Sequence, residues 1–460
     1  MALAFVILAA GFSKRMKTKR SKVLHPLAGR PLIRYISDLA ASFGPDRLVF
    51  VVSEGGEGMP GTPEGSLFAV QKEPLGTGHA ALAAEASLGG FAGTVCVING
   101  DSPLLTRETL DRLLETHEAG GAAATVLTSE LADPTGYGRI LRRDGSVARV
   151  VEETDATDEE RGIREVNTGF YCFDKGALFT ALHSVESANA QGEYYLTDVI
   201  EILLSKGMKV DAAQGADPDE ILGVNSRREL AVAERVLKER QIERLFEAGA
   251  TVVDPASTFV GPEVEVGRDT IVHPFTFLEG ATVIGEDCVI GPSTRLVDCT
   301  VADGAEVAFT VAKGAEIGPE ATVGPYAHLR PGTKVGRGAK VGGFVEVKKS
   351  EIGEGSKVPH LSYIGDAVIG KDVNVGAGTI TCNYNGFEKH ETVIEDEAFI
   401  GSDTMLIAPV RIGKGAVTGA GSAISEDVPA DALGLERAEQ ENVEGWAKER
   451  RERHKSGGSE

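Results

Sequence analysis

Aliphatic residues recur at every sixth position through most of the second half of the chain, in three runs that each keep their register. A period of six does not fit an α-helix, which repeats every 3.6 residues, but it equals three strand steps of two. We therefore expect short strands joined by tight turns, each placing one aliphatic side chain inside a prism. The runs are Val266, Val272, Leu278, Ile284, Ile290 and Leu296; Ile317, Val323, Leu329, Val335, Val341 and Val347; and Ile394, Ile400, Leu406 and Ile412, after which Thr418 departs in type and Ile424 restores it.

Stacked coils of such strands would bury a continuous aliphatic column, which is the repeat pattern of the hexapeptide parallel β-helix. Glycine often follows the aliphatic position, as at Gly285 and Gly318, and it supplies turn geometry that side chains would forbid. A glycine-rich β-sandwich with accidental spacing is the alternative, and three runs in strict register argue against it. The pattern resembles the left-handed β-helix family, a known exception to the rule of right-handed crossovers.

The first 225 residues have a different pattern, in which short apolar runs alternate with segments of helical spacing. This alternation predicts an α/β domain with a largely parallel sheet. The expected strands include 5–10, 48–52 and 95–98, and the expected helices are 32–41, 106–119 and 197–206.

We expect three parts in the chain: a first domain over 1–225, a linker helix over 226–249 and a β-helix domain with its tail over 250–460. Ser226 and Glu229 have the spacing of a capping box, and helical spacing continues to 248. A charged helix is expected over 436–453 as a cap on the solenoid, with a disordered end over 455–460.

Composition and charge exclude several classes of protein. The 460 residues include 42% hydrophobic residues, as in ordinary globular proteins, and the formal net charge of −22 disfavours nucleic acid and anionic lipid as partners. The apolar run over 3–11 is too short to span a bilayer, and basic residues follow it, which is the reverse of a signal peptide. Five scattered cysteines without a CxxC pair indicate neither a disulfide framework nor a zinc ribbon. We expect a cytoplasmic protein.

A basic loop follows the first expected strand. It runs from Gly11 to Met16 and contains Lys14 and Arg15, with Lys22 close behind. Backbone N–H groups in such a loop can hold phosphates, and Arg and Lys can neutralise them. The loop has neither a Walker motif nor a GxGxxG motif, so a solvated basic surface is the alternative.

Two further segments favour a nucleotide site. Asp101 follows the strand 95–98, and ligands of α/β sheets bind beyond the carboxyl ends of strands, where a carboxylate can share Mg²⁺ with phosphates. An aspartate in a tight turn before Pro103 is the alternative. The segment from Gln71 to His79 is a second loop of small residues, whose glycines would let a base or a sugar approach the backbone; a surface hairpin is its alternative.

The β-helix half carries its own polar set. Arg330 and Lys348 lie eighteen residues apart, which is about one coil, so they should stack on one face and could hold an anion such as a sugar phosphate. A charge ladder with nearby glutamates is the alternative, although stacked like charges destabilise. His360 follows, and acyl transfer to an amine needs a base near neutrality. The segment 381–393 interrupts the hexads as a long loop, which on a rigid solenoid is often functional.

Motifs in both halves resemble the bacterial bifunctional N-acetylglucosamine-1-phosphate uridylyltransferase / glucosamine-1-phosphate N-acetyltransferase family, from about residue 3 to residue 446. The resemblance implies acetyl transfer from acetyl-CoA to glucosamine-1-phosphate in the second domain, then Mg²⁺-dependent uridylyl transfer from UTP in the first, with release of pyrophosphate. The product, UDP-N-acetylglucosamine, would supply peptidoglycan and lipopolysaccharide synthesis. The partners implied are these small molecules, and the implied assembly is a homotrimer with shared acetyl-transfer sites. The motifs are Leu8-Ala9-Ala10-Gly11, Lys22-Val23-Leu24-His25, Leu75-Gly76-Thr77-Gly78-His79, Gly136-Tyr137-Gly138-Arg139-Ile140, Val166-Asn167-Thr168-Gly169 and Gly192-Glu193-Tyr194-Tyr195-Leu196-Thr197-Asp198.

The resemblance implies a Rossmann-like nucleotidyltransferase domain for the first part of the chain, and it also implies the residues of the first site. Arg15 and Lys22 would contact the phosphates as catalytic cations, and Asp101 and Asn225 would bind Mg²⁺. In the motif at 11–16, Ser13 and Lys14 stand where the family usually has Gly and Thr, and Asn99 replaces a usual aromatic residue. The residues implied for UTP and the sugar nucleotide are Leu8, Ala9, Ala10, Gly11, Lys22, Gln71, Gly76, Thr77, Asn99, Gly100, Asp101, Gly138, Glu152, Asn167 and Asn225.

For the second site, the resemblance implies that His360 is the general base that takes the proton of the attacking amine. Arg330 and Lys348 would hold the phosphate of glucosamine-1-phosphate, and Tyr363 and Asn374 would hold its sugar. The residues implied for acetyl-CoA are Ala377, Asn383, Tyr384, Ser402, Ala420 and Arg437.

Three other functions fit less well. A pyrophosphorylase whose β-helix only oligomerises would not need His360, Lys348 and the interrupting loop. A β-helix metalloenzyme related to carbonic anhydrase needs three clustered histidines with a close pair, which the spaced histidines of this chain do not provide. An interaction scaffold would not need Asp101 and Gln71 beside a Gly-Thr-Gly loop.

Overall fold

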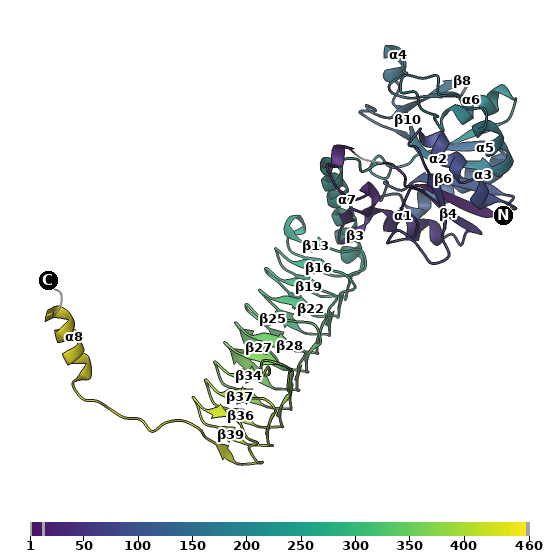
Figure 1. Cartoon of the computed structure of the whole chain (residues 1–460). Helices are drawn as coiled ribbons and strands as arrows, with labels where there is room; N and C mark the ends of the chain where they lie inside the picture. Colours follow the sequence, from purple (N-terminus) through teal and green to yellow (C-terminus); the bar gives the residue numbers. More distant parts are fainter. Residues whose placement is uncertain (1, 12–13, 457–460) are drawn as a thin grey trace. The chain divides into compact units, whose positions relative to one another are not determined.

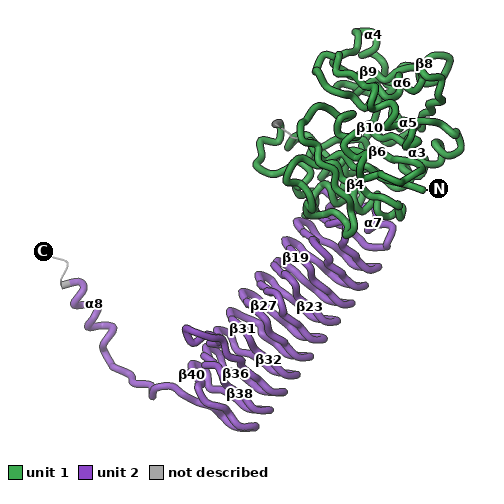
Figure 2. Tube along the Cα trace, turned by 45° about the vertical axis from the view of Figure 1, so that its right-hand side comes forward, with its two compact units in different colours: residues 1–240 green, residues 241–460 purple. Residues whose placement is uncertain are grey.

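The computed structural model describes residues 2–11 and 14–456, and they form two compact units, 1–240 and 241–460 (Figure 2). The division falls within the long helix α7 (Arg227–Glu247), in the segment where the sequence predicts a connecting helix. Phe12 and Ser13 of the expected phosphate loop lie outside the described residues.

The first unit contains a mixed sheet with the strand order β11-β7-β10-β6-β1-β4-β5 (Figure 1). β1 is parallel to β4 and β6, as expected, but β10 is antiparallel to β6 and β7, and β8 and β9 form an antiparallel hairpin beside it. The sheet is therefore less parallel than the alternation of strands and helices predicts. The strands are β1 (Leu3–Leu8), β4 (Arg47–Ser53), β5 (Leu67–Gln71), β6 (Thr94–Asn99), β7 (Ala124–Glu130), β8 (Gly138–Arg143), β9 (Ser146–Val151), β10 (Glu165–Asp174) and β11 (Val210–Gln214), with the separate pair β2 (Pro26–Leu27) and β3 (Arg30–Pro31).

Helices cover both faces of this sheet, because side chains alternate between the faces along each strand. Ala4 and Val6 of β1 belong to the core cluster shared with α2, α5 and α6, and Phe5 and Ile7 belong to the cluster shared with α1 and α3. All four side chains are buried. The helices are α1 (Leu32–Ala41), α2 (Thr77–Ala83), α3 (Arg107–Gly120), α4 (Asp158–Arg161), α5 (Lys175–Leu182) and α6 (Asp198–Ser205).

Side-chain caps define where several helices begin. The hydroxyl of Thr106 accepts the N–H of Thr109 at the start of α3, and Ser226 accepts the N–H of Glu229 at 3.2 Å at the start of α7. The expected capping box is only half formed, because the Glu229 carboxylate accepts the N–H of Asn225 at 2.7 Å instead of that of Ser226. This contact fixes the backbone of Asn225, a predicted metal ligand.

The second unit is a left-handed parallel β-helix made of three sheets of short strands (Figure 1). Each coil contributes one strand to each sheet, and neighbouring coils are hydrogen-bonded in register. The first sheet has β12 (Thr251–Val252), β15 (Ile271–Val272), β18 (Val289–Ile290), β21 (Glu306–Val307), β24 (Thr322–Val323), β27 (Lys340–Gly343), β30 (Lys357–His360), β33 (Asn374–Val375), β36 (Phe399–Ile400), β39 (Val417–Thr418) and β41 (Leu433–Gly434). The second has β13 (Phe259–Val260), β16 (Phe277–Glu279), β19 (Arg295–Val297), β22 (Val311–Lys313), β25 (His328–Leu329), β28 (Glu346–Lys348), β31 (Tyr363–Gly365), β34 (Ile380–Cys382), β37 (Met405–Ile407) and β40 (Ala423–Ile424). The third has β14 (Glu265–Val266), β17 (Val283–Ile284), β20 (Thr300–Val301), β23 (Ala315–Ile317), β26 (Thr333–Val335), β29 (Glu351–Ile352), β32 (Ala367–Ile369), β35 (Thr392–Ile394) and β38 (Val410–Ile412).

The aliphatic residues of the three runs form the core of the β-helix, and Thr418 is buried with them. Between the first and second runs the repeat shortens to five residues at some steps, from Leu296 to Val301 and from Val307 to Ala312, and these side chains stay buried. The column is therefore continuous where the sequence period breaks, because a turn can lose one residue without moving the strand that follows it.

The end of the chain differs from the prediction. The charged helix α8 (Trp446–Ser456) begins ten residues later than the expected start at 436, and it includes Lys455, which the sequence assigns to a disordered end. Residues 457–460 lie outside the described part of the chain. Across the residues that the structure describes, every helix is too short or too polar to cross a membrane.

Candidate functional site

A cavity of about 690 Å³ opens in the first unit at the carboxyl ends of β1, β5 and β6. This is the edge where ligands of α/β sheets bind. The structure brings together here all but one of the residues predicted for the nucleotide and the sugar. Those on its wall are Leu8, Ala9, Ala10, Gly11, Arg15, Lys22, Gln71, Gly76, Thr77, Asn99, Asp101, Gly138, Glu152, Asn167 and Asn225.

Gly100 lies beside the cavity rather than on its wall. Its N–H donates to the carbonyl of Leu8 at 2.9 Å, and a Cβ at this position would lie 2.9 Å from Cδ1 of Ile33. Gly100 therefore lets the ends of β1 and β6 lie close together above α1. Asn99 packs in a similar way, since a Cβ at Gly169 would lie 2.5 Å from its Nδ2.

Lys22 and the two predicted metal ligands meet at one end of the cavity. The Lys22 ammonium forms an ion pair with the Asp101 carboxylate and donates to Oδ1 of Asn225 at 2.8 Å. All three come from different segments, and the carbonyl of Asp101 accepts the N–H of Val224 at 2.9 Å, which fixes Asn225 nearby.

The oxygens of Asp101 and Asn225 suit Mg²⁺, because carboxylate and amide oxygens are the hard ligands this ion takes from proteins. In the structure a cation, the Lys22 ammonium, already lies between these two oxygens. Residues 2–11 and 14–456 contain no cluster of three or more His, Cys, Asp or Glu side chains arranged to hold a metal. A two-ligand site of this kind would complete its coordination with phosphate and water oxygens.

The segment from Gln71 to His79, predicted as a loop, is a loop only as far as Gly76, because α2 begins at Thr77, and it packs against a distant segment. Nε2 of Gln71 donates to the carbonyl of Gly76 at 3.1 Å, and the Thr77 hydroxyl accepts the N–H of Leu196 at 3.1 Å. Gly76 has a φ of +112°, and a Cβ there would lie 2.5 Å from the carbonyl oxygen of Tyr194. The glycine is thus required by the backbone of Tyr194, whereas the sequence suggests that it admits a base or a sugar.

The opposite end of the cavity contains Glu152 and Asn167. Oε1 of Glu152 accepts the Thr197 hydroxyl at 3.1 Å; burial raises the pKa of Glu152, and the nearby carboxylates, Asp198 first, add to the increase. Oδ1 of Asn167 accepts the Tyr171 hydroxyl at 2.8 Å, which leaves the amide N–H groups of Asn167 to bind a ligand.

Several wall residues have no predicted role, among them Tyr171, Thr197 and Glu229. Thr197 belongs to a motif that carries the resemblance, and the sequence places it at the start of an expected helix. Glu229 is predicted only as a capping-box residue. The contact of Thr197 with Glu152 joins segments 45 residues apart, which motif spacing does not report, whereas Tyr171 and Glu229 contact Asn167 and Asn225 four residues away.

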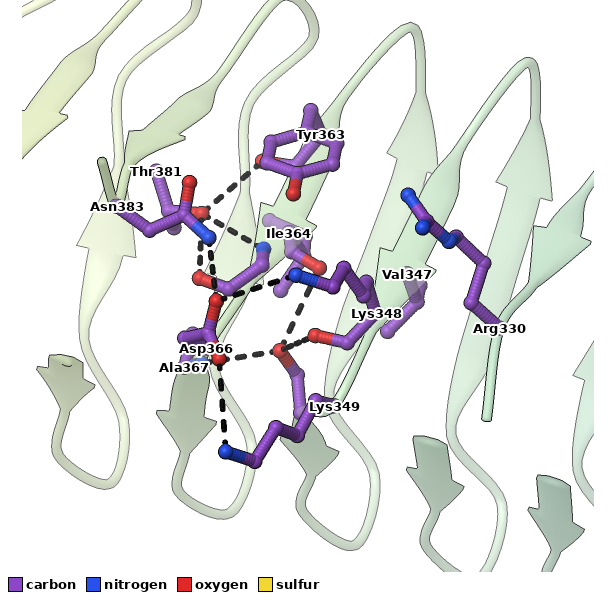
Figure 3. A network of polar contacts seen from close by, with 12 residues as sticks. Arg330, Val347, Lys348, Lys349, Tyr363, Ile364, Asp366, Ala367, Thr381 and Asn383 are labelled. Atoms are coloured by element: carbon purple, nitrogen blue, oxygen red, sulfur yellow. Dashed lines mark hydrogen bonds and ion pairs between the residues drawn. The ribbon is translucent and has the colours of Figure 1, made fainter. Parts of the chain in front are cut away.

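In the second unit, Arg330 and Lys348 lie at equivalent positions of neighbouring coils, as their spacing predicts. The backbone N–H of Arg330 donates to the carbonyl of Val347 at 2.8 Å. Each cation has an acidic partner. Arg330 pairs with Glu346 at 3.0 Å. Lys348 pairs with Asp366 at 3.7 Å, as Figure 3 shows. The alternative of a ladder with carboxylates therefore describes part of the arrangement, although both cations stay partly exposed.

His360 ends β30 and is exposed, and Tyr363 begins β31 on the other side of the turn. Within the described part of the chain, the His360 imidazole makes no hydrogen bond; the contact of this residue is from the Ser362 hydroxyl to its carbonyl, at 2.8 Å. The exposed imidazole is therefore accessible to a molecule bound at this turn.

A column of small residues continues from His360 down the β-helix. In the first sheet, strand residues pair in register from coil to coil: Lys357 with Asn374, Asn374 with Phe399, and Phe399 with Val417. The residue three positions after each of these lies at the equivalent turn, which gives a column made of His360, Ala377, Ser402 and Ala420. The column is tied by backbone hydrogen bonds, from Asp403 to the carbonyl of Ala377 at 2.7 Å and from Gly421 to that of Ser402 at 2.8 Å. Arg437 donates to the carbonyl of Ala420 at 3.2 Å. Three predicted acetyl-CoA residues thus lie in line with His360, and a fourth, Arg437, contacts the last of them.

The interrupting loop is shorter than expected, since β34 ends at Cys382 and β35 begins at Thr392. Asn383 at its base is buried and donates to Asp366 at 2.5 Å, whereas Tyr384 is 60% exposed. Lys389 of this loop has no predicted role. It lies against Lys348, whose ammonium lowers the pKa of Lys389, and two close ammonium groups favour an anion beside them.

Asn374 lies on β33 beside Lys357, one coil from His360. Asn374 precedes Ala377 of the column by three residues. Tyr363, the other residue predicted to bind the sugar, makes no hydrogen bond with Asn374 in the described part of the chain.

Comparisons with known proteins cover both units. The model of the MobA-like NTP transferase domain matches residues 5–168, that of the bacterial transferase hexapeptide (six repeats) matches 314–349, and that of the hexapeptide repeat of succinyl-transferase matches 391–426. The bifunctional protein GlmU of Halalkalibacterium halodurans is 50% identical over 441 residues, which are 95% of this chain and 97% of that protein. The bifunctional protein GlmU of Heliobacterium modesticaldum is 51% identical over 435 residues, 94% and 95% of the two chains. A solved UDP-glucose pyrophosphorylase complexed with UDP-glucose aligns with 52% of this chain and all of its own, at 20% identity and a TM-score of 0.44.

Proposed function

The chain belongs to the family of bifunctional GlmU proteins, and on this premise we propose the substrates and residues of its two reactions. It is a transferase with a uridylyltransferase activity and a glucosamine-1-phosphate acetyltransferase activity. We propose that the second unit first transfers the acetyl group of acetyl-CoA to glucosamine-1-phosphate. The first unit then joins the product to UTP, which yields UDP-N-acetylglucosamine and pyrophosphate.

The convergence of Lys22, Asp101 and Asn225 in one cavity carries the proposal for uridylyl transfer. An oxygen of the sugar phosphate attacks the α-phosphorus of UTP, and pyrophosphate leaves. Such transfers depend on in-line positioning and on charge neutralisation rather than on a protein nucleophile. Mg²⁺ held by Asp101 and Asn225 would neutralise phosphate charge. Lys22 would then turn from these oxygens toward the phosphates, beside Arg15.

At the sugar end of the same cavity, Asn167 offers amide donors and Glu152 offers acceptors to hydroxyl groups. Gly138 lies between them, since a Cβ there would be 3.5 Å from both Oε2 of Glu152 and Cβ of Asn167. The absence of a side chain at this position keeps room for the sugar ring.

For acetyl transfer, we propose that Arg330 and Lys348 bind the phosphate of glucosamine-1-phosphate, and that Tyr363 and Asn374 bind its sugar. His360 takes the proton from the amine as it attacks the thioester carbon; the C–S bond then breaks and the thiol of coenzyme A leaves. The small side chains of the column below His360 leave a shallow path along which the pantetheine chain of acetyl-CoA can lie.

One assay tests the proposal as a whole. Purified protein is incubated with glucosamine-1-phosphate, acetyl-CoA, UTP and Mg²⁺, and UDP-N-acetylglucosamine is measured by mass spectrometry. We expect its formation to require acetyl-CoA, and added N-acetylglucosamine-1-phosphate to remove that requirement. Transfer of uridylyl to glucosamine-1-phosphate at the same rate without acetyl-CoA would contradict the order of the two steps.

We further propose that the chain forms a homotrimer through an apolar ridge along one corner of the β-helix. The ridge is made of large side chains that are 37–65% exposed and lie at equivalent turns, with Ser293 as an interruption. The rings of Phe309 and Tyr326 lie 5.5 Å apart, and those of Tyr326 and Phe344 lie 5.2 Å apart. Its residues are Phe275, Phe309, Tyr326, Phe344 and Leu361.

Backbone strain supports this role of the ridge. All five residues have φ values between 48° and 60°, a left-handed conformation that costs a side-chain-bearing residue about 1–2 kcal/mol. Beyond Leu361 the same turn is made by Gly378 and Asp403, which tolerate the conformation better. Large apolar residues kept in strained and exposed turns favour a contact surface, and a second copy of the chain is the partner we propose.

The free thiols of all five cysteines support a reducing compartment, which we propose to be the cytoplasm.

A further inference from the structure

Asp366 occupies the turn between β31 and β32, beside Lys348, one of the two cations of the proposed acetyl-transfer site (Figure 3). Its side chain is only 12% exposed. Its N–H donates to the carbonyl of Lys348 at 3.0 Å, and its carbonyl accepts the N–H of Thr392 at 3.1 Å. The backbone of Asp366 therefore joins the coil of Lys348 to the strand that follows the 383–391 loop.

The Asp366 carboxylate contacts three side chains that come from two different segments. Oδ2 lies 3.7 Å from Nζ of Lys348 and accepts Nδ2 of Asn383 at 2.5 Å, and Oδ1 lies 4.0 Å from Nζ of Lys349 (Figure 3). One buried carboxylate thus contacts both a proposed phosphate-binding cation and the base of the loop.

Another aspartate at the equivalent turn shows what a structural role looks like. Asp298 follows β19 as Asp366 follows β31, in the same column of turns and with a similar left-handed φ of 52°. Its Oδ1 accepts the backbone N–H of Ala281 at 3.1 Å, in the preceding coil. Asp298 supports a turn, whereas Asp366 directs its carboxylate to functional side chains.

The contact between Asp366 and Asn383 holds the base of the 383–391 loop. The carbonyl of Asn383 accepts the N–H of His390 at 2.8 Å, which closes the base of the loop, and Lys389 lies within this segment, against Lys348. Without a carboxylate at 366, the repulsion between Lys348 and Lys389 would have no nearby negative charge to balance it.

We propose that Asp366 is a positioning residue for acetyl transfer: it holds the Lys348 ammonium and the base of the 383–391 loop in one arrangement without touching substrate. This inference rests on the proposed function, because Lys348 is the residue that would bind the phosphate. Two parts of the site separated in sequence are thereby aligned by one charge, and an error of about 1 Å in such alignment can cost about 100-fold in rate.

The test compares Asp366→Asn with the matched control Asp298→Asn in the full-length protein. We expect Asp366→Asn to lower kcat/KM for glucosamine-1-phosphate about 10- to 100-fold, mainly through KM, and to leave uridylyl transfer unchanged. Asp298→Asn should leave acetyl transfer unchanged. A wild-type value for Asp366→Asn would overturn the proposal.

A double-mutant cycle separates positioning from a general loss of structure. In the background of Lys348→Ala, Asp366→Asn should have little further effect, because the cation that it orients is gone. Effects that simply multiply would overturn the proposal. Asp366→Glu keeps the negative charge, so it tests the proposal even if Asp366→Asn does not fold. It should retain most of the acetyl-transfer activity. A loss of activity as large as that of Lys348→Ala would count against a positioning role.

Limited digestion with trypsin gives a readout that does not depend on activity. Lys389 is a cleavage site within the loop, and its cleavage should be faster in Asp366→Ala than in wild type or Asp298→Ala, because the base of the loop loses its acceptor. Equal cleavage rates would overturn the contact with Asn383. A wild-type protein that does not acetylate glucosamine-1-phosphate would instead refute the proposed function, while the digestion still tests Asp366.

Discussion

Lys22 forms an ion pair with Asp101 in the nucleotide cavity, with its ammonium between the two oxygens proposed to bind Mg²⁺. One position could thus serve two cations. Mg²⁺ held by Asp101 and Asn225 would take the place of the ammonium, and Lys22 would then be available to the phosphates.

Asp101→Ala removes the charged ligand of the proposed metal site. We expect uridylyl transfer to fall at least ~100-fold, because charge develops on phosphate oxygens in the transition state. Acetyl transfer should not change. Asp111→Ala, at an exposed ion pair on α3, is the control. A mutant that retains Mg²⁺-dependent turnover would mean that Asp101 only forms a turn before Pro103.

His360→Ala tests the proposed general base. Loss of such a base typically costs about 10²–10⁴-fold, and we expect kcat of acetyl transfer to fall within that range. The melting temperature and the oligomeric state should be unchanged, because among the described residues the imidazole has no hydrogen-bonding partner and the aliphatic column does not include it. A stable protein with normal kcat would refute the assignment.

A chain that ends near Ala250 tests whether the activities are separable. The first unit has its own core clusters on both faces of its sheet, so it should fold and keep uridylyl transfer. Acetyl transfer should be lost with the β-helix. Acetylation of glucosamine-1-phosphate by the folded fragment would show that the acetyl-transfer site does not lie in the β-helix.

Phe344→Asp tests the apolar ridge. A charge at its most exposed ring should shift the mass measured by light scattering from a trimer toward a monomer, since an unpaired buried carboxylate is costly. Val283→Asp is the control, because Val283 is 42% exposed on β17, in the third sheet and away from the ridge. If only Val283→Asp dissociated the trimer, the subunit interface would lie on the third sheet and not on the ridge.

Asp198 predicts a dependence of stability on pH. Burial raises the pKa of Asp198 to about 6 from its ordinary 3.8, and Glu201 adds to the increase. Between these values the folded state binds more protons than the unfolded state, so the free energy of unfolding falls as pH rises from about 4 to about 6. Asp198→Asn should remove this slope and raise the melting temperature at pH 7. Parallel stability curves for the two proteins would contradict the assignment.

The amino-acid sequence predicts the α/β class of the first unit and the β-helix of the second. Periodicity of six indicates the β-helix because a parallel coil buries one residue per strand, and this depends on local spacing alone. Helix α1 was predicted over its full range, because apolar spacing defines its buried face. The sequence did not predict the antiparallel β10, because the direction of a strand depends on which neighbour it pairs with.

The candidate sites show the same division. Motifs identified most of the residues that line the cavity of the first unit, but only tertiary structure brings Asn225 to Asp101 and the Tyr194 backbone against Gly76. The sequence also did not predict the contacts of Asp366 and Lys389 with Lys348, because each depends on a neighbour in another coil. Sequence spacing determines which face a side chain lies on, since backbone geometry repeats locally. Contacts between distant segments are decided by packing and charge in the folded chain, which no local pattern records.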